Sequence, residues 1–129
     1  MSALRPFEIE VVRLLASEKL SDAQRASLAD VPCAATTYEY TGYGYYLTIP
    51  HESLPAESKT LDTPYIIGWC GDVRVGFVVH LGARELVLQC YKWGKGDVLP
   101  DFRDKAVAVR LLRADEVLII NRPGISGDS

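Results

Sequence analysis

The chain has 129 residues, of which 48% are hydrophobic and 24% are charged, and its formal net charge is −3. This length fits one domain that buries a core without disulfides or metals, and the composition excludes intrinsic disorder. An acidic balance spread along the chain argues against nucleic acid and membranes as partners, because both select a basic face. We predict a single domain over residues 1–121 and a flexible tail over residues 122–129.

Cysteine usage and the N-terminal residues bear on the compartment. Cys33, Cys70 and Cys90 form no CxxC pair, and an odd number of cysteines is typical of reduced thiols in a cytosolic protein. Acidic residues interrupt the N-terminal MSALRPFEIEVV, which therefore fits neither a signal peptide nor an anchor. No window reaches the ~20 apolar residues of a membrane span. We expect a cytoplasmic protein.

Two helices are predicted at the start of the chain. Apolar residues recur at helical spacing over residues 6–19, and a proline suits the first turn because its missing N–H costs nothing there. Glu8 falls with the other charged residues, away from the apolar stripe. Ser21 and Gln24 form a capping-box pattern, which predicts a second helix over residues 22–30.

Residues 36–50, TTYEYTGYGYYLTIP, predict a β-hairpin that turns at Gly-Tyr-Gly. Alternation divides the strands into one face with Tyr38, Tyr40, Tyr45, Leu47 and Ile49 and another with Thr37, Glu39, Thr41, Tyr46 and Thr48. The division is the same for either two-residue turn, because both keep the parity of pairing. We expect the tyrosines of the first face to be core side chains with hydroxyls at the boundary. Tyr43 and Tyr46 are then the surface candidates of this hairpin.

The next residues, 51–63, are polar and predict a surface loop. A three-strand meander follows over residues 65–70, 73–81 and 85–93, with two-residue turns at Gly71-Asp72 and Ala83-Arg84. One of its faces is strongly apolar: Ile66, Val73, Val75, Phe77, Val79, Leu81, Leu86, Leu88 and Cys90. The reverse face carries Tyr65, Ile67, Trp69, Arg74, Val78, His80, Val87, Gln89, Tyr91 and Trp93. Because this mixture is too apolar for water and too polar for a core, we expect the helices or a partner to cover part of it.

The last part of the chain favours two more strands, over residues 107–112 and 117–120, because β-branched residues are frequent there. A helix that begins at Asp101 is the alternative, since Asp101 and Asp104 suit a first turn. The predicted fold is therefore α+β, with two N-terminal helices packed on an antiparallel, hairpin-rich sheet of about five to seven strands.

Catalytic signatures are weak throughout. Alternation places His80 on the face opposite Cys90, which disfavours a cysteine nucleophile with a histidine base. His51 and His80 are far apart, without ligand spacing, and the short glycine patterns lack a phosphate-loop context, so we expect no metal and no cofactor. A group of carboxylates could supply acid–base chemistry, although a solvated loop explains it equally: Glu39, Asp97, Asp101 and Asp104.

Aromatic and basic residues of the meander could stack nucleic-acid bases: Trp69, Arg74, Tyr91, Lys92 and Trp93. The acidic total and the lack of a Lys/Arg stripe disfavour nucleic acid as a partner. Trp69 opposite Arg74 is equally well explained as a cross-strand cation–π contact.

Four segments carry a resemblance to known proteins: RPFE at residues 5–8, YTGYGYY at 40–46, GFVV at 76–79 and QCYKWG at 89–94. Together they make the chain similar to a family of small uncharacterised bacterial single-domain proteins. Small proteins of this kind are often encoded near secreted toxins and act as their immunity partners, so the resemblance implies a toxin domain as the partner by analogy.

The sequence thus predicts a non-enzymatic protein-interaction module, in concrete form an immunity protein that neutralises a toxin domain. Aromatic residues provide the predicted contacts, because tyrosine and tryptophan are enriched in binding hot spots: Tyr43, Tyr46, Trp69, Tyr91 and Trp93. The alternative is a small-molecule-binding protein or small enzyme with a pocket between helices and sheet. A homodimer formed through an uncovered sheet face or edge is a third possibility.

Overall fold

The computed structural model describes residues 4–28, 30–94 and 96–112. Its helices are α1 (Pro6–Ala16) and α2 (Asp22–Leu28), and short 3-10 turns occupy Cys33–Ala35 and Phe102–Asp104. The strands are β1 (Thr37–Tyr40), β2 (Gly44–Pro50), β3 (Lys59–Leu61), β4 (Ile66–Cys70), β5 (Val73–Gly82), β6 (Glu85–Lys92) and β7 (Ala108–Leu111). The α+β class, the two N-terminal helices and the hairpin-rich antiparallel sheet are confirmed.

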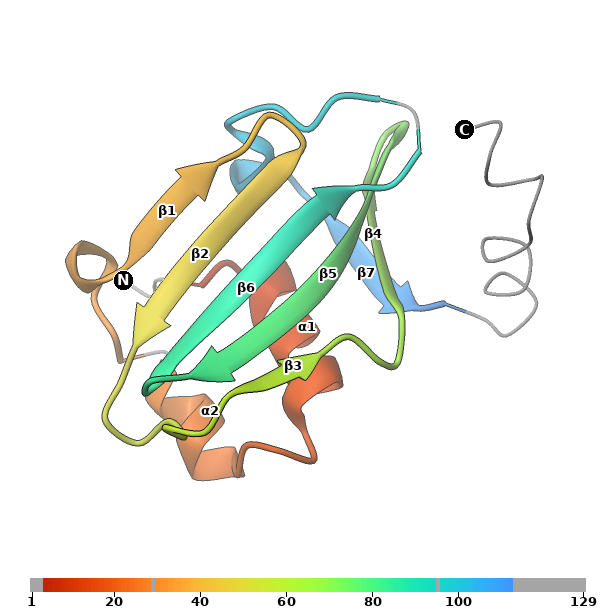
Figure 1. The fold of residues 1–129 in the computed structure, drawn as a ribbon. Helices are drawn as coiled ribbons and strands as arrows, with labels where there is room; N and C mark the ends of the chain where they lie inside the picture. Colours follow the sequence, from red (N-terminus) through yellow and green to blue (C-terminus); the bar gives the residue numbers. More distant parts are fainter. Residues whose placement is uncertain (1–3, 29, 95, 113–129) are drawn as a thin grey trace.

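All seven strands belong to one sheet, in the order β1-β2-β6-β5-β4-β7, with β3 paired to β5 (Figure 1). The predicted pairing of Phe77 with Cys90 is confirmed. In the first hairpin Tyr40 pairs with Tyr45, so the turn lies at Gly42-Tyr43, one of the two registers that the sequence left open. The turn at Ala83-Arg84 has two residues with positive φ, 52° and 58°, as a two-residue hairpin turn requires. The geometry of the turn and the alternation of apolar residues along the strands therefore lead to the same pairing of β5 with β6.

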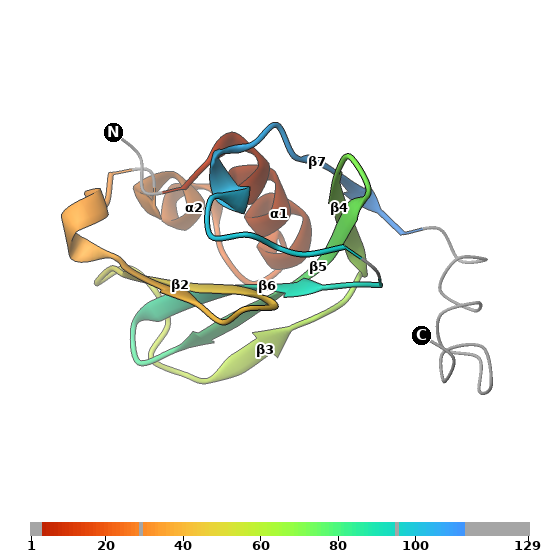
Figure 2. The ribbon, with the colours of Figure 1, turned by 90° about the horizontal axis from the view of Figure 1, so that it is seen from above.

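Both helices lie on one side of the sheet (Figure 2). A proline opens α1, and the Glu8 carboxylate accepts a hydrogen bond from the Arg5 backbone N–H at 2.7 Å. At α2 the Ser21 N–H donates to Gln24 Oε1, and the Gln24 N–H donates to Ser21 Oγ, which is the predicted capping box. The helices end at Ala16 and Leu28, somewhat earlier than the sequence pattern indicated.

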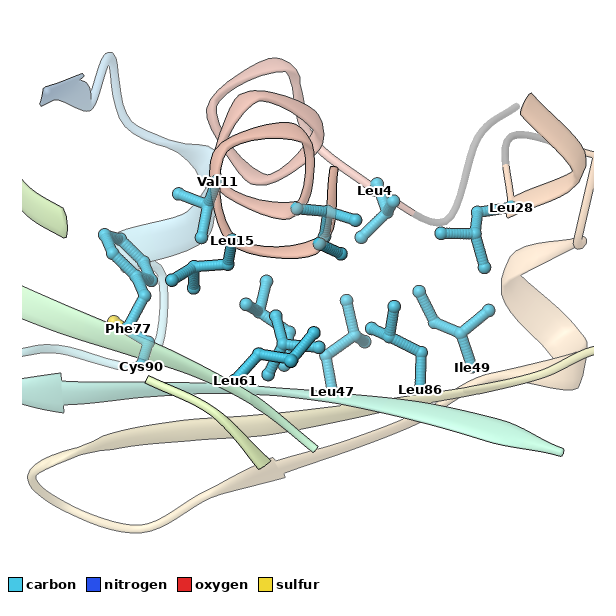
Figure 3. Packing of buried hydrophobic residues seen from close by; sticks show 14 of the residues in the cluster. Leu4, Val11, Leu15, Leu28, Leu47, Ile49, Leu61, Phe77, Leu86 and Cys90 are labelled. Atoms are coloured by element: carbon cyan, nitrogen blue, oxygen red, sulfur yellow. The ribbon is translucent and has the colours of Figure 1, made fainter. Parts of the chain in front are cut away.

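The core fills the space between α1 and the predicted apolar sheet face. Val11 and Leu15 point from α1 toward Phe77 and Cys90 of the sheet (Figure 3). Phe7 adds ring contacts to Phe77 and Phe102, with centroids 6.1 and 6.4 Å apart. In the part of the chain that the structure describes, no helix is long and apolar enough to cross a membrane.

Three expectations about local structure were wrong. The loop predicted over residues 51–63 contains β3, which pairs with the far half of β5. Tyr38 and Tyr40 lie on the predicted face, but 38% and 37% of their surfaces are exposed, because β1 is an edge strand that the helices do not reach. Glu8, expected on the outer side of α1, is completely buried.

The structure decides part of the choice between two strands and a helix in the C-terminal residues. A short 3-10 turn follows Asp101, and β7 then pairs with β4, so a strand forms within residues 107–112. The second predicted strand, over residues 117–120, lies outside the described residues. The same holds for the domain boundary at residue 121 and for the tail over residues 122–129.

Candidate functional site

The sheet face turned away from the helices is the candidate site, and we call it the open face. It consists of the reverse face predicted from alternation, extended onto β2 and β7. Within the described residues no helix covers it, and Figure 2 shows both helices on the opposite side. Most of its side chains are half-buried by their neighbours on the sheet itself, among them Tyr46, Val78, Val87 and Gln89. Of the two covers expected for this face, the N-terminal helices are excluded, and a partner stays a prediction.

One end of the open face gathers the chain's two tryptophans and two arginines. Arg74 pairs with Trp69, and the Trp93 N–H donates to the Arg74 carbonyl at 2.9 Å, so these three residues form one row across the sheet. In the next row Arg110 pairs with Ile67, and its guanidinium lies 5.8 Å from the centre of the Trp69 ring. We call Trp69, Arg74, Trp93 and Arg110 the tryptophan–arginine patch.

Tyr91 borders this patch in a fixed position. Its ring lies against Gly76, where a β-carbon would come within 2.5 Å of the ring and the hydroxyl oxygen. The missing side chain at position 76 thus makes room for the tyrosine. Burial raises the pKa of the Tyr91 hydroxyl, and the neighbouring Tyr65 and Asp62 raise it further. Tyr91 is a packed, protonated phenol rather than a mobile one.

The other predicted contacts also lie on or beside the open face. Tyr46 occupies its middle, opposite Gln89. Tyr43 stands in the β1–β2 turn with 69% of its surface exposed, and its carbonyl accepts a hydrogen bond from the Lys92 N–H at 2.6 Å. This bond places the turn beside the end of β6, next to Trp93. All five residues named from the sequence therefore lie on or beside the open face, although Tyr46 on β2 is three strands away from Trp69 on β4.

Arg110 was missed by sequence reasoning. It reaches the patch because β7 pairs with β4, which is a contact between segments that are far apart in the chain. The only sequence signal was the alternation of residues 107–112, which did not identify the neighbouring strand. The cross-strand pairing of Trp69 with Arg74 was predicted and is confirmed, but the guanidinium that lies over the Trp69 ring belongs to Arg110 instead of Arg74.

The histidine on the open face has partners of its own. His80 Nε2 lies 2.9 Å from Gln89 Oε1, and its Nδ1 lies 3.4 Å from Thr60 Oγ1. Cys90 is buried on the helix side of the sheet, where burial, followed by the charge of Glu8, raises the pKa of its thiol. The two residues lie on opposite faces, which excludes a Cys90–His80 nucleophile pair.

A second polar cluster is buried between α1 and the sheet. Both Glu8 oxygens accept bonds from Arg103, each at 2.8 Å, and the Tyr45 hydroxyl donates to Oε2 at 2.5 Å. The Arg103 guanidinium also lies 5.6 and 5.7 Å from the centres of the Tyr38 and Tyr45 rings. Burial, and then the Glu8 charge, raise the pKa of the Tyr45 hydroxyl. With each Glu8 oxygen saturated by donors, this cluster stabilises the fold and presents no free group to a substrate.

The carboxylates considered for acid–base chemistry are not brought together. Asp97, Asp101 and Asp104 pair separately with Lys92, Lys105 and Arg5, at 3.9, 3.9 and 2.8 Å. Glu39 is exposed on β1. Among the described residues no group of His, Cys, Asp and Glu side chains has an arrangement that could hold a metal ion.

A groove of about 270 Å³ runs between α1 and α2. Its walls are mainly apolar, with Leu4, Ile9, Val12 and Leu28, and Arg13 and Arg25 border it. This groove therefore lies between the two helices, whereas the small-molecule-binding alternative predicted a pocket between helices and sheet.

No protein-family model, curated protein or solved structure matches this chain. The family resemblance drawn from the RPFE, YTGYGYY, GFVV and QCYKWG segments therefore stays a prediction.

Proposed function

We propose that the chain is a non-enzymatic protein-interaction module that binds its partner through the open face. One observation carries the proposal: an aromatic and apolar sheet face that no described helix covers. Most of its side chains are half-buried, and contiguous apolar surface that stays accessible on a folded domain is typical of interaction sites. Tryptophan, tyrosine and arginine, which gather at one end of this face, are the residue types enriched in hot spots.

The dimensions of the face suit a protein partner. Strands lie ~4.8 Å apart, so the five strands from β2 to β7 in the sheet order span about 20 Å. The 8 residues of β6 extend about 26 Å at ~3.3 Å per residue. The outline is then about 500 Å² for each partner, which falls in the range of small, transient protein interfaces.

The strongly perturbed groups do not support catalysis. Tyr45 and Cys90 have raised pKa values, but both are buried on the helix side and face core residues or Glu8. A catalytic acid or base must reach a substrate, normally in a concave pocket. His80, the histidine of the open face, is bonded to Gln89.

Site-specific photo-crosslinking in the cells that make the protein tests this function. A photoreactive phenylalanine at position 78 samples the middle of the open face, and one at position 18, just after α1, is the matched control on the helix side. We expect a discrete crosslinked protein from position 78 and none from position 18. Equal products from both positions, or none from position 78, would refute the proposal.

A toxin domain is the more specific kind of partner that we propose, and the family resemblance is the only support for it. Co-expression with the product of a neighbouring toxin gene tests it. The wild-type chain should restore growth, and Val78→Arg should not, because a charge in the middle of the face opposes desolvation on binding. Growth rescue by both chains would contradict the use of this face.

Small-molecule binding is a second candidate function, favoured by the groove between α1 and α2. Ile9 leaves 46% of its surface exposed there, which is unusual for a large aliphatic side chain with a nearby core. A fragment screen observed by NMR tests this candidate. Shifts confined to residues of the groove, and lost in Ile9→Glu, would support it, whereas a screen without such shifts would end it.

A further inference from the structure

We infer that the partner of the open face is an acidic protein segment, whose carboxylate Arg74 binds between Trp69 and Trp93. This inference rests on the proposed function and names the chemistry of the partner. It starts from the state of one side chain in the tryptophan–arginine patch.

Arg74 differs from the other arginines that the structure describes. Four of these form ion pairs with carboxylates: Arg5 with Asp104, Arg13 with Glu10, Arg25 with Asp22 and Arg103 with Glu8. Arg84 donates to backbone carbonyls, and Arg110 lies over Trp69 and donates to the Leu111 carbonyl. Within the described residues, the Arg74 guanidinium has neither an ion pair nor a hydrogen bond, and its residue is exposed. In a chain of net charge −3, this cation is available to an external anion.

The surroundings of Arg74 strengthen its attraction for a carboxylate. Strand spacing places Trp69 on one side of it and Trp93 on the other, each ~5 Å away along the row. Large flat rings exclude water from a docked carboxylate and so lower the local dielectric, which increases the charge–charge attraction. Guanidinium binds a carboxylate with two parallel hydrogen bonds and tolerates aromatic neighbours better than an ammonium does.

Protein is favoured over nucleic acid as the carrier of the anion. Affinity for nucleic acid grows with the number of phosphates neutralised, and this patch offers only two guanidiniums. Away from the patch the face continues with Val78, Val87 and Tyr46, which suit apolar side chains of a protein partner.

Selection from a random peptide library tests the inference on the full chain. Twelve-residue peptides displayed on phage are selected on the immobilised protein, and binding of the selected peptides is measured by tryptophan emission. Both tryptophans of the chain lie in the patch, so emission reports on this site alone. Arg74→Glu is the test variant. Lys19→Glu, at an exposed position just after α1, makes the same change in charge on the helix side and is the matched control.

We expect the selected peptides to be richer in Asp and Glu than the starting library. They should bind Arg74→Glu at least roughly tenfold more weakly, because a charge-assisted bidentate pair becomes a repulsion, and bind Lys19→Glu within about twofold of wild type. Thermal unfolding shows that both variants are folded. Equal binding to Arg74→Glu, or selected peptides without an acidic excess, overturns the inference.

The remaining outcomes distinguish a failure of the acidic-partner inference from a failure of the proposed function. If the selected peptides are not acidic but lose binding to Val78→Arg, the acidic partner is refuted and the function of the open face stands. If Val78→Arg binds them like wild type, the proposed function fails as well. If a fifteen-nucleotide oligothymidylate binds more tightly than any peptide, the partner is nucleic acid and the inference is overturned. If light scattering shows a dimer that Val78→Arg dissociates, the partner is a second copy of the chain and the inference is likewise overturned.

Discussion

Replacing Glu8 by glutamine should destabilise the fold far more than its location on a surface helix suggests. The two Glu8 oxygens accept four hydrogen bonds: one from the Arg5 backbone, two from Arg103 and one from Tyr45. Glutamine has one acceptor oxygen, so two donors lose their acceptor and meet an NH₂ group instead. Each hydrogen bond to a charged group contributes ~1.5–3 kcal/mol, and the loss is about 3–5 kcal/mol. Removing one partner of a buried ion pair costs a similar amount.

Urea unfolding at pH 7 measures this effect. With an m-value of about 2 kcal/mol per M, the midpoint of Glu8→Gln should fall by about 1.5–2.5 M. Glu10→Gln is the matched control, because Glu10 lies in the same helix and its pair with Arg13 is exposed. Its unfolding free energy should change by less than about 1 kcal/mol.

A double-mutant cycle decides whether the charge pair is responsible. Glu8→Gln combined with Arg103→Met should lose less free energy than the two single changes added, because the methionine leaves no unpaired guanidinium. If Glu8→Gln costs no more than Glu10→Gln, or if the two losses simply add, the buried cluster does not stabilise the fold as described here.

Three further results are expected. The free energy of unfolding should fall as the pH rises above about 9. The raised pKa values of Cys90 and Tyr45 keep both side chains protonated in the folded chain, whereas the unfolded chain releases these protons near pH 9 and 10. Chemical unfolding at pH 7 and pH 10.5 checks this, and an unchanged free energy of unfolding contradicts it. Gly44→Ala should lower the stability of the fold by several kcal/mol in thermal unfolding, since the new β-carbon would lie 1.9 Å from the Cys90 carbonyl oxygen. Gly42→Ala is the control, because Gly42 has open space around it and a φ of 89°, and this change should cost only about 1–2 kcal/mol. A thiol reagent should modify Cys33 first and Cys90 only on unfolding, and rapid reaction of two thiols in Cys33→Ser would refute this order.

Alternation accounts for what the sequence revealed of this fold. Side chains repeat every two residues in a strand, so the apolar set containing Phe77 and Leu88 could face the core in one register only. Two-residue turns then fixed the hairpins without reference to the rest of the chain. The same parity assigns Tyr46, Trp69, Tyr91 and Trp93 to the open face from the sequence alone.

Contacts between distant segments account for what the sequence did not reveal. Glu8 looked exposed because its partners, Tyr45 and Arg103, lie far from it in the chain. Tyr38 looked buried because parity gives the face of a residue but not its distance from the sheet edge. Arg110 joined the patch through the pairing of β7 with β4, which nothing local determines. Its absence from the predicted contacts therefore has the same cause as the wrong placement of Glu8.

The bond between Glu8 and Arg103 joins residues 95 positions apart, and this separation affects how the protein is made. Ribosomes add about 5–20 residues per second, so the Glu8 carboxylate is synthesised roughly 5–20 s before its guanidinium partner. During that interval α1 cannot settle on the sheet without burying an uncompensated charge. Strand β6 is complete only when Lys92 is added, 11 residues before Arg103. We therefore expect α1 to complete its packing on the sheet only after residue 103 is synthesised.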